Sequence, residues 1–150
     1  MKRALAGLMV IVVVMMTGCA SFSDKKLSWN MTQSVSRSGG DVAMTALLDE
    51  GVDAKKSREY VAALIQLIEK GDIDKVALRQ ACLDTAAKLK LTGVADYIDA
   101  LMVVVPGRIG DYEKIPLKYR EALVSFLRDG ATHALDLYKA DKKPAAPDGG

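Results

Sequence analysis

Apolar side chains recur at helical spacing along most of the chain after residue 40, and glycine or proline separates the segments. An apolar residue at every third or fourth position predicts an amphipathic helix with one buried face. No β-branched residues alternate with polar ones over a sustained stretch, so we expect no sheet. The sequence therefore predicts an all-α fold, a small irregular bundle of about five helices. These run from Asp41 to Gly51, from Asp53 to Lys70, from Asp74 to about Lys90, from Thr92 to Val105, and from Pro116 to about Tyr138.

The ends of these helices carry recognisable signals. Asp41, Asp53 and Asp74 each precede a predicted helix, where a short carboxylate side chain can accept a hydrogen bond from a free backbone N–H. Thr92 can play the same part for the fourth helix. That helix is apolar nearly all round, so we expect it at the centre of the bundle. Gly130 can divide the fifth helix in two.

The beginning of the chain has a different pattern. Lys2 and Arg3 precede an unbroken apolar run that ends at Met16, and a threonine–glycine pair follows. A basic start, an apolar stretch and small residues next to a cleavage site are typical of a secretory signal peptide. The run is shorter than the roughly 20 residues that a membrane-spanning helix needs. Residues 1–18 are therefore predicted to be a cleaved signal peptide.

The sequence Met16-Thr17-Gly18-Cys19 resembles the lipobox of bacterial lipoproteins. The resemblance implies a diacylglyceryl thioether on Cys19, cleavage before this residue, and usually a further acyl chain such as palmitate on the new amino terminus. Two or three acyl chains hold a protein stably on a membrane, whereas one chain binds only marginally. Cys19 is followed by Ala20 instead of the aspartate that retains such proteins in the inner membrane, which implies anchoring in the outer membrane, facing the periplasm.

The rest of the mature chain divides into three parts. Residues 19–40 are predicted to be the lipidated N-terminus and a flexible tether, because this stretch is rich in serine, asparagine and glycine and has no sustained apolar period. The helical domain is expected over residues 41–139. Residues 140–150, with their lysine, proline and glycine residues, are predicted to be a disordered tail.

The charge of the mature chain is balanced. The full sequence has 21 basic and 19 acidic residues, and Lys2 and Arg3 leave with the signal peptide, so 19 of each remain. Scattered charges of both signs predict neither a nucleic-acid partner nor a polybasic cluster that would hold anionic lipid. With Cys19 acylated, Cys82 is the remaining thiol, which excludes a disulfide within the chain.

The sequence contains no recognisable catalytic, cofactor or metal motif, and we do not expect an enzyme. His133 is the only histidine, so a histidine metal cluster is excluded. Ser125, Asp129 and His133 lie four residues apart on one predicted helix, but a triad needs the histidine between serine and carboxylate. These three residues are therefore expected on a solvated face. Cys82 lies among apolar residues, which predicts a buried, inert thiol.

Two functions remain open. The leading interpretation is a membrane-anchored, non-enzymatic interaction protein, serving as a scaffold or accessory subunit of an envelope complex. The alternative is a helical binding module for a hydrophobic ligand such as a lipid or peptide. A cavity lined by Leu64, Ile68, Leu101 and Met102 would favour the ligand, whereas a solid core with an exposed apolar patch would favour a protein partner. The partner's identity and the oligomeric state do not follow from the sequence.

Overall fold

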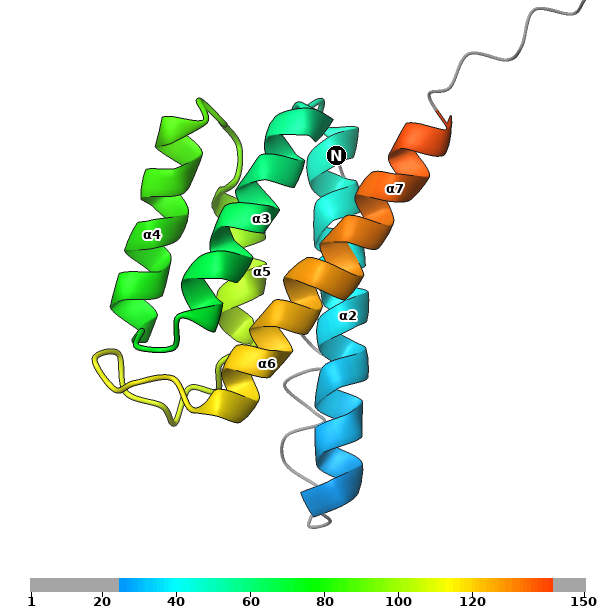
Figure 1. Ribbon diagram of the computed structural model, residues 1–150. Helices are drawn as coiled ribbons and strands as arrows, with labels where there is room; N and C mark the ends of the chain where they lie inside the picture. Colours follow the sequence, from blue (N-terminus) through cyan, green and yellow to red (C-terminus); the bar gives the residue numbers. More distant parts are fainter. Residues whose placement is uncertain (1–24, 142–150) are drawn as a thin grey trace, which may run out of the picture.

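Helices account for nearly all regular structure in the computed structural model, which describes residues 25–141 (Figure 1). Because α6, the π-helix η1 and α7 follow one another without a break, they form a single long rod. The predicted all-α bundle of about five helices is confirmed. The elements are α2 (Lys25–Asp49), α3 (Ala54–Glu69), α4 (Lys75–Lys88), α5 (Ala95–Val103), α6 (Leu117–Ser125), η1 (Phe126–Ala131) and α7 (Thr132–Asp141).

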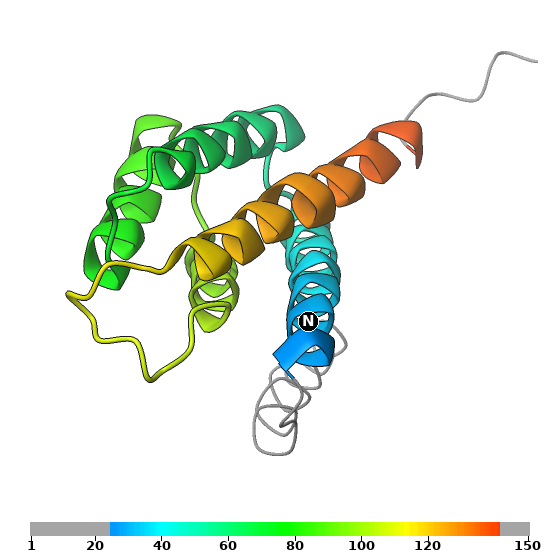
Figure 2. The ribbon, with the colours of Figure 1, turned by 60° about the horizontal axis from the view of Figure 1, so that its bottom comes forward.

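The helices surround an aromatic centre. The rod formed by α6, η1 and α7 lies diagonally across α2, and α3, α4 and α5 lie to one side of this crossing (Figures 1 and 2). Tyr97 of α5 lies between two other rings, with centroid distances of 6.2 Å to Tyr60 of α3 and 5.7 Å to Phe126 of η1. Tilted aromatic pairs at such distances are favourable beyond the area they bury. One row of rings therefore connects three helices.

The closest packing occurs where η1 crosses α2, at Gly40 and Gly130. A Cβ atom added at Gly130 would lie 2.8 Å from both the Asp41 nitrogen and the Gly40 Cα, and it would also collide with the Arg37 carbonyl oxygen. A Cβ atom added at Gly40 would lie 2.8 Å from the Phe126 carbonyl carbon. The two backbones are therefore in direct contact, which only glycine permits at these positions.

The π-helix keeps one face of the long rod against the core. The buried residues of the rod recur every four positions, and an α-helix turns about 100° per residue, so each repeat overshoots a full turn by about 40°. Over several repeats an uninterrupted α-helix would rotate the last pairs out of the core. The wider π turn takes up this rotation. The buried pairs are Ala122 and Leu123, Phe126 and Leu127, Gly130 and Ala131, and Ala134 and Leu135.

The predicted tether is wrong for residues 25–40, which form the first part of α2. Ser36 is only 2% exposed, and Gly39 and Gly40 are also buried. Small residues allow the π-helix to approach, and packing against it stabilises a helix whose own sequence has weak propensity. Residues 19–24 lie outside the described part of the chain. At the other end α7 extends to Asp141, two residues into the predicted tail, and the remainder of that tail is likewise outside the description.

Two of the predicted helix caps are confirmed and two are wrong. Asp53 and Asp74 accept hydrogen bonds of 2.8 Å from the backbone nitrogens of Lys56 and Ala77. Asp41 instead lies inside α2, because that helix begins sixteen residues earlier than predicted. The fourth helix begins at Ala95 after Val94, so Thr92 does not cap it.

The expectation that the helix from Thr92 to Val105 is the centre of the bundle is also wrong. Leu101 is fully buried, but α5 has only nine residues and its Val103 is 39% exposed. The helix lies beside α2 and α4, and α2 and η1 supply the tightest contact instead.

The loop between α5 and α6 is held firmly against the turn that precedes α4. The Ile115 nitrogen donates to the Ile73 carbonyl oxygen at 2.9 Å, and the Val76 nitrogen donates to that of Asp111 at 3.2 Å. Lys75 Nζ also donates to the Ile109 carbonyl oxygen. Although residues 106–116 form no helix, this loop has a defined position relative to the bundle.

We predict that Gly130→Ala strongly destabilises the fold. The added methyl group would have to displace the backbone of α2, and overpacking of this kind typically costs about 1–3 kcal/mol or more. Gly107→Ala is the matched control, because a Cβ atom there meets nothing within 4 Å. Urea denaturation should show a lower midpoint for the first variant and a nearly unchanged one for the second. Equal midpoints would contradict the close crossing.

Candidate interaction surfaces

The predicted lipidation site lies just before the described residues. Cys19, with the rest of residues 1–24, is outside the described part of the chain, and α2 begins at Lys25, six residues after this cysteine. Within residues 25–141, no helix combines the length and apolar character needed to cross a bilayer. The anchoring prediction therefore continues to rest on the sequence pattern.

The three residues that superficially resemble a catalytic trio do not act together in the structure. Ser125 Oγ donates to Asp129 Oδ2 at 2.9 Å, as expected for exposed residues one turn apart. His133 Nδ1 lies 3.1 Å from Oδ2 of Asp41, a carboxylate on α2. The histidine thus links α7 to α2 across the helix crossing, and a salt bridge there requires a protonated ring.

Cys82 belongs to a buried cluster with Tyr60 and Tyr97. The thiol is fully buried, as predicted, and its burial raises the pKa of Cys82 to about 11. The Tyr60 hydroxyl donates to the Cys82 carbonyl oxygen at 3.2 Å, whereas the buried Tyr97 hydroxyl has no hydrogen-bond partner among the described residues. The pKa of both tyrosines is raised, mainly because they are buried and to a smaller extent because Cys82 lies nearby. All three groups are held in their neutral forms.

A cleft of about 510 Å³ lies between the N-terminal half of α2, the end of α3, and the rod formed by α6 and η1. Of the residues predicted to line a ligand cavity, Ile68 touches this cleft, while Leu64 and Leu101 are fully buried in the core. Seven of the ten residues that line the cleft are charged or polar, and Arg128 forms a 2.5 Å salt bridge with Glu69. Such a surface suits a polar group more than a lipid chain.

An apolar surface that the sequence did not predict lies on α4 and α5. Val76 and Leu83, seven residues apart on α4, are 44% and 46% exposed although their spacing suggests a buried stripe. Arg79 lies between them and forms a 2.7 Å salt bridge with Asp99 of α5. Val103, one turn after Asp99, is exposed on α5. We call Val76, Leu83 and Val103, with the salt bridge among them, the α4–α5 face.

The sequence contains a signal for this face that is visible in retrospect. Leu78, Cys82 and Ala86 recur every four residues and form the buried stripe of α4. Val76 and Leu83 fall outside that series, so α4 has two apolar faces, of which the bundle covers one. An exposed apolar surface is typical of a contact site for another protein.

Comparisons of the chain with protein-family models, with curated proteins and with solved structures find no match.

We predict that Cys82 reacts slowly with thiol reagents in the folded protein. A pKa of about 11, two units above the ordinary value, leaves roughly a hundredfold less thiolate at pH 8, and burial also blocks access. Labelling should become fast in urea. Rapid labelling without denaturant would contradict the buried position.

The same shift predicts alkaline destabilisation. The fold favours the protonated thiol, so this contribution to stability is complete below pH 9 and is lost as the pH rises towards 11. Urea denaturation at a series of pH values should show this fall. Cys82→Ala should reduce the dependence of stability on pH. The loss of stability that comes from the two tyrosines should remain above pH 10.

Proposed function

We propose that this protein is a bacterial envelope lipoprotein, anchored in the membrane by acyl chains on Cys19, that acts as a non-enzymatic interaction, scaffold or accessory protein. The observation that carries the proposal is the lipobox-like sequence Met16-Thr17-Gly18-Cys19 at the end of a short apolar run. The residue after the cysteine, Ala20, favours the outer membrane facing the periplasm.

The structure supports an interaction role through the α4–α5 face. The aromatic centre is filled by buried side chains and the helix crossing is closed by backbone contact, while Val76, Leu83 and Val103 remain exposed beside a salt bridge. Exposed apolar side chains around a charged pair suit the surface of a folded protein partner, which can bury the apolar side chains and satisfy the charges. The alternative role, binding of a hydrophobic ligand, gains no support from the cleft, where seven of the ten lining residues are charged or polar.

The lipidation is tested by Cys19→Ser. In cells of an expressing bacterium fed radiolabelled palmitate, the wild-type chain should take up label and be shortened, because acylation precedes cleavage at such sites. The variant should take up none and accumulate as the full-length precursor. Equal labelling of the two chains would overturn the lipoprotein proposal.

The interaction surface is tested by photo-crosslinking in intact cells. A photoreactive residue at Leu83 should give a discrete crosslinked product with an envelope protein, while the same residue at Ala63, which is exposed on α3, should not. Leu83→Glu should abolish copurification of that partner and change stability by no more than about 0.5 kcal/mol, as is usual for surface substitutions. Identical products from both positions would argue against a contact at the α4–α5 face.

A further inference from the structure

The described helices begin very close to the proposed anchor. Only five residues lie between Cys19 and Lys25, where α2 starts, and each of the six steps along a fully extended chain covers at most about 3.6 Å. The start of α2 is therefore held within about 22 Å of an acylated Cys19. A tether reaching to residue 40 would leave the orientation of the domain free, whereas this short connection restricts which end of the bundle faces the membrane.

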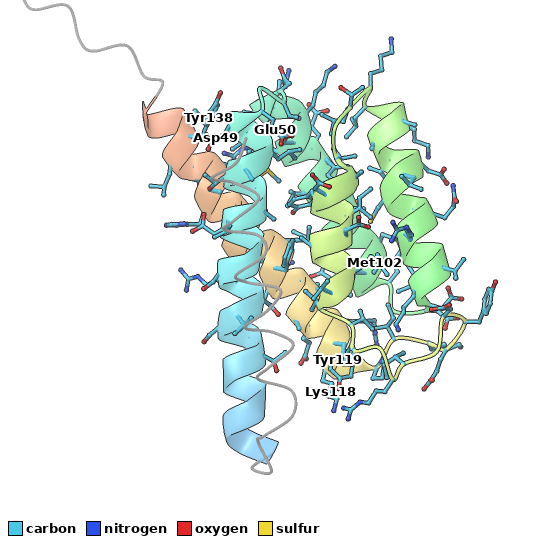
Figure 3. The ribbon with its side chains drawn as sticks, turned by 180° about the vertical axis from the view of Figure 1, so that it is seen from behind. Asp49, Glu50, Met102, Lys118, Tyr119 and Tyr138 are labelled. Carbon is cyan, nitrogen blue, oxygen red and sulfur yellow. The ribbon has the colours of Figure 1, made fainter. Side chains whose placement is uncertain are left out.

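The end of the bundle nearest the start of α2 is formed by the loop of residues 106–116 and the first turn of α6. Figures 1 and 3 show α2 beginning at this end, where Lys118 lies. Asp49, Glu50 and Tyr138 lie at the opposite end (Figure 3). We call the first of these the loop end.

The loop end has the two most exposed large apolar side chains of the described residues. Tyr112 is 82% exposed and Leu117 is 60% exposed. Hydrogen bonds pin the loop to the turn before α4, which gives the backbone near Tyr112 a defined position. Leu117 is the first residue of α6. Tyrosine and leucine are well suited to the boundary between lipid headgroups and acyl chains, where an amphipathic ring or an apolar side chain gains from partial burial.

Cations at the same end are bound to neutral groups. Arg108 donates to the Tyr119 hydroxyl at 2.5 Å, and Lys118 Nζ lies 4.8 Å from the centroid of the same ring. Within the described residues, neither cation forms a salt bridge, unlike Lys114, which is paired with Asp72 at 2.6 Å. Both are therefore available to lipid phosphate. Because acidic residues also lie on the loop, the attraction comes from the placement of these cations and not from a net positive charge.

We infer that the loop end rests on the phospholipid headgroups of the membrane that holds the anchor, with Leu117 and Tyr112 at the interface and Arg108 and Lys118 next to phosphate groups. The inference rests on the proposed acylation of Cys19. It adds an orientation, in which the α4–α5 face points along the membrane plane and the opposite end of the bundle points away from the lipid.

The test compares two leucines of similar exposure at opposite ends. Leu117→Cys and Leu137→Cys, the latter 53% exposed beside Tyr138, are each labelled with an environment-sensitive fluorophore on the purified, acylated protein. The protein is placed in vesicles of phosphatidylethanolamine and phosphatidylglycerol that contain a lipid with a nitroxide on its headgroup. The wild-type chain, treated identically, controls for labelling of Cys82, and circular dichroism confirms that each variant is folded.

The expected result is loss of most of the fluorescence at position 117 and little loss at position 137. Equal quenching at both positions, or no quenching at either in a vesicle-bound protein, would overturn the orientation and leave the lipoprotein proposal intact. Mass spectrometry distinguishes the other failure: a chain without acyl groups that stays in solution would overturn both.

Discussion

The direct contact between the backbones of α2 and η1 is the constraint on which the rest of the fold depends. With glycine at both positions 40 and 130, the helices approach until no side chain separates them. That approach carries the buried residues of α2 and of the long rod into one core and places Phe126 against Tyr97. It also allows His133 to reach Asp41 from the neighbouring helix. A larger distance between the two helices would break all of these contacts at once.

Much of the fold follows from the sequence, because most helices have both an apolar period and a defined beginning. Asp53 and Asp74 cap the helices that they were predicted to cap, and Cys82 is buried as its neighbours indicate. The first part of α2 could not be predicted in the same way. Among residues 32–40, where burial is described, Ser36, Gly39 and Gly40 are buried, and such small residues indicate equally a flexible linker or a close helix contact. Only the position of η1 shows that the stretch is a helix contact and not a linker.

The exposed surfaces were harder to predict than the core. Val76 and Leu83 match a helical apolar period as well as the buried Leu78 and Cys82 do, so periodicity alone does not show which stripe the bundle covers. The loop end likewise depends on long-range contacts, such as those that Arg108 and Lys118 make with Tyr119. The residues of the loop end can be related to the proposed anchor only when the direction of α2 relative to the bundle is known.

The π turn makes the number of residues in the rod as important as their identity. Deleting a single residue between Phe126 and Ala131 would let an ordinary α-helix form through this segment. Leu123 and Leu135 would then be separated by about three full turns plus only about 20°, so α7 would keep nearly the same face against the core. If instead every residue were kept and the segment became α-helical, α7 would be rotated by about 120° relative to α6. Ala134 and Leu135 would then leave the core, and His133 would turn away from Asp41, although no residue had been replaced. The π turn therefore accommodates one additional residue while the buried face of the rod stays continuous.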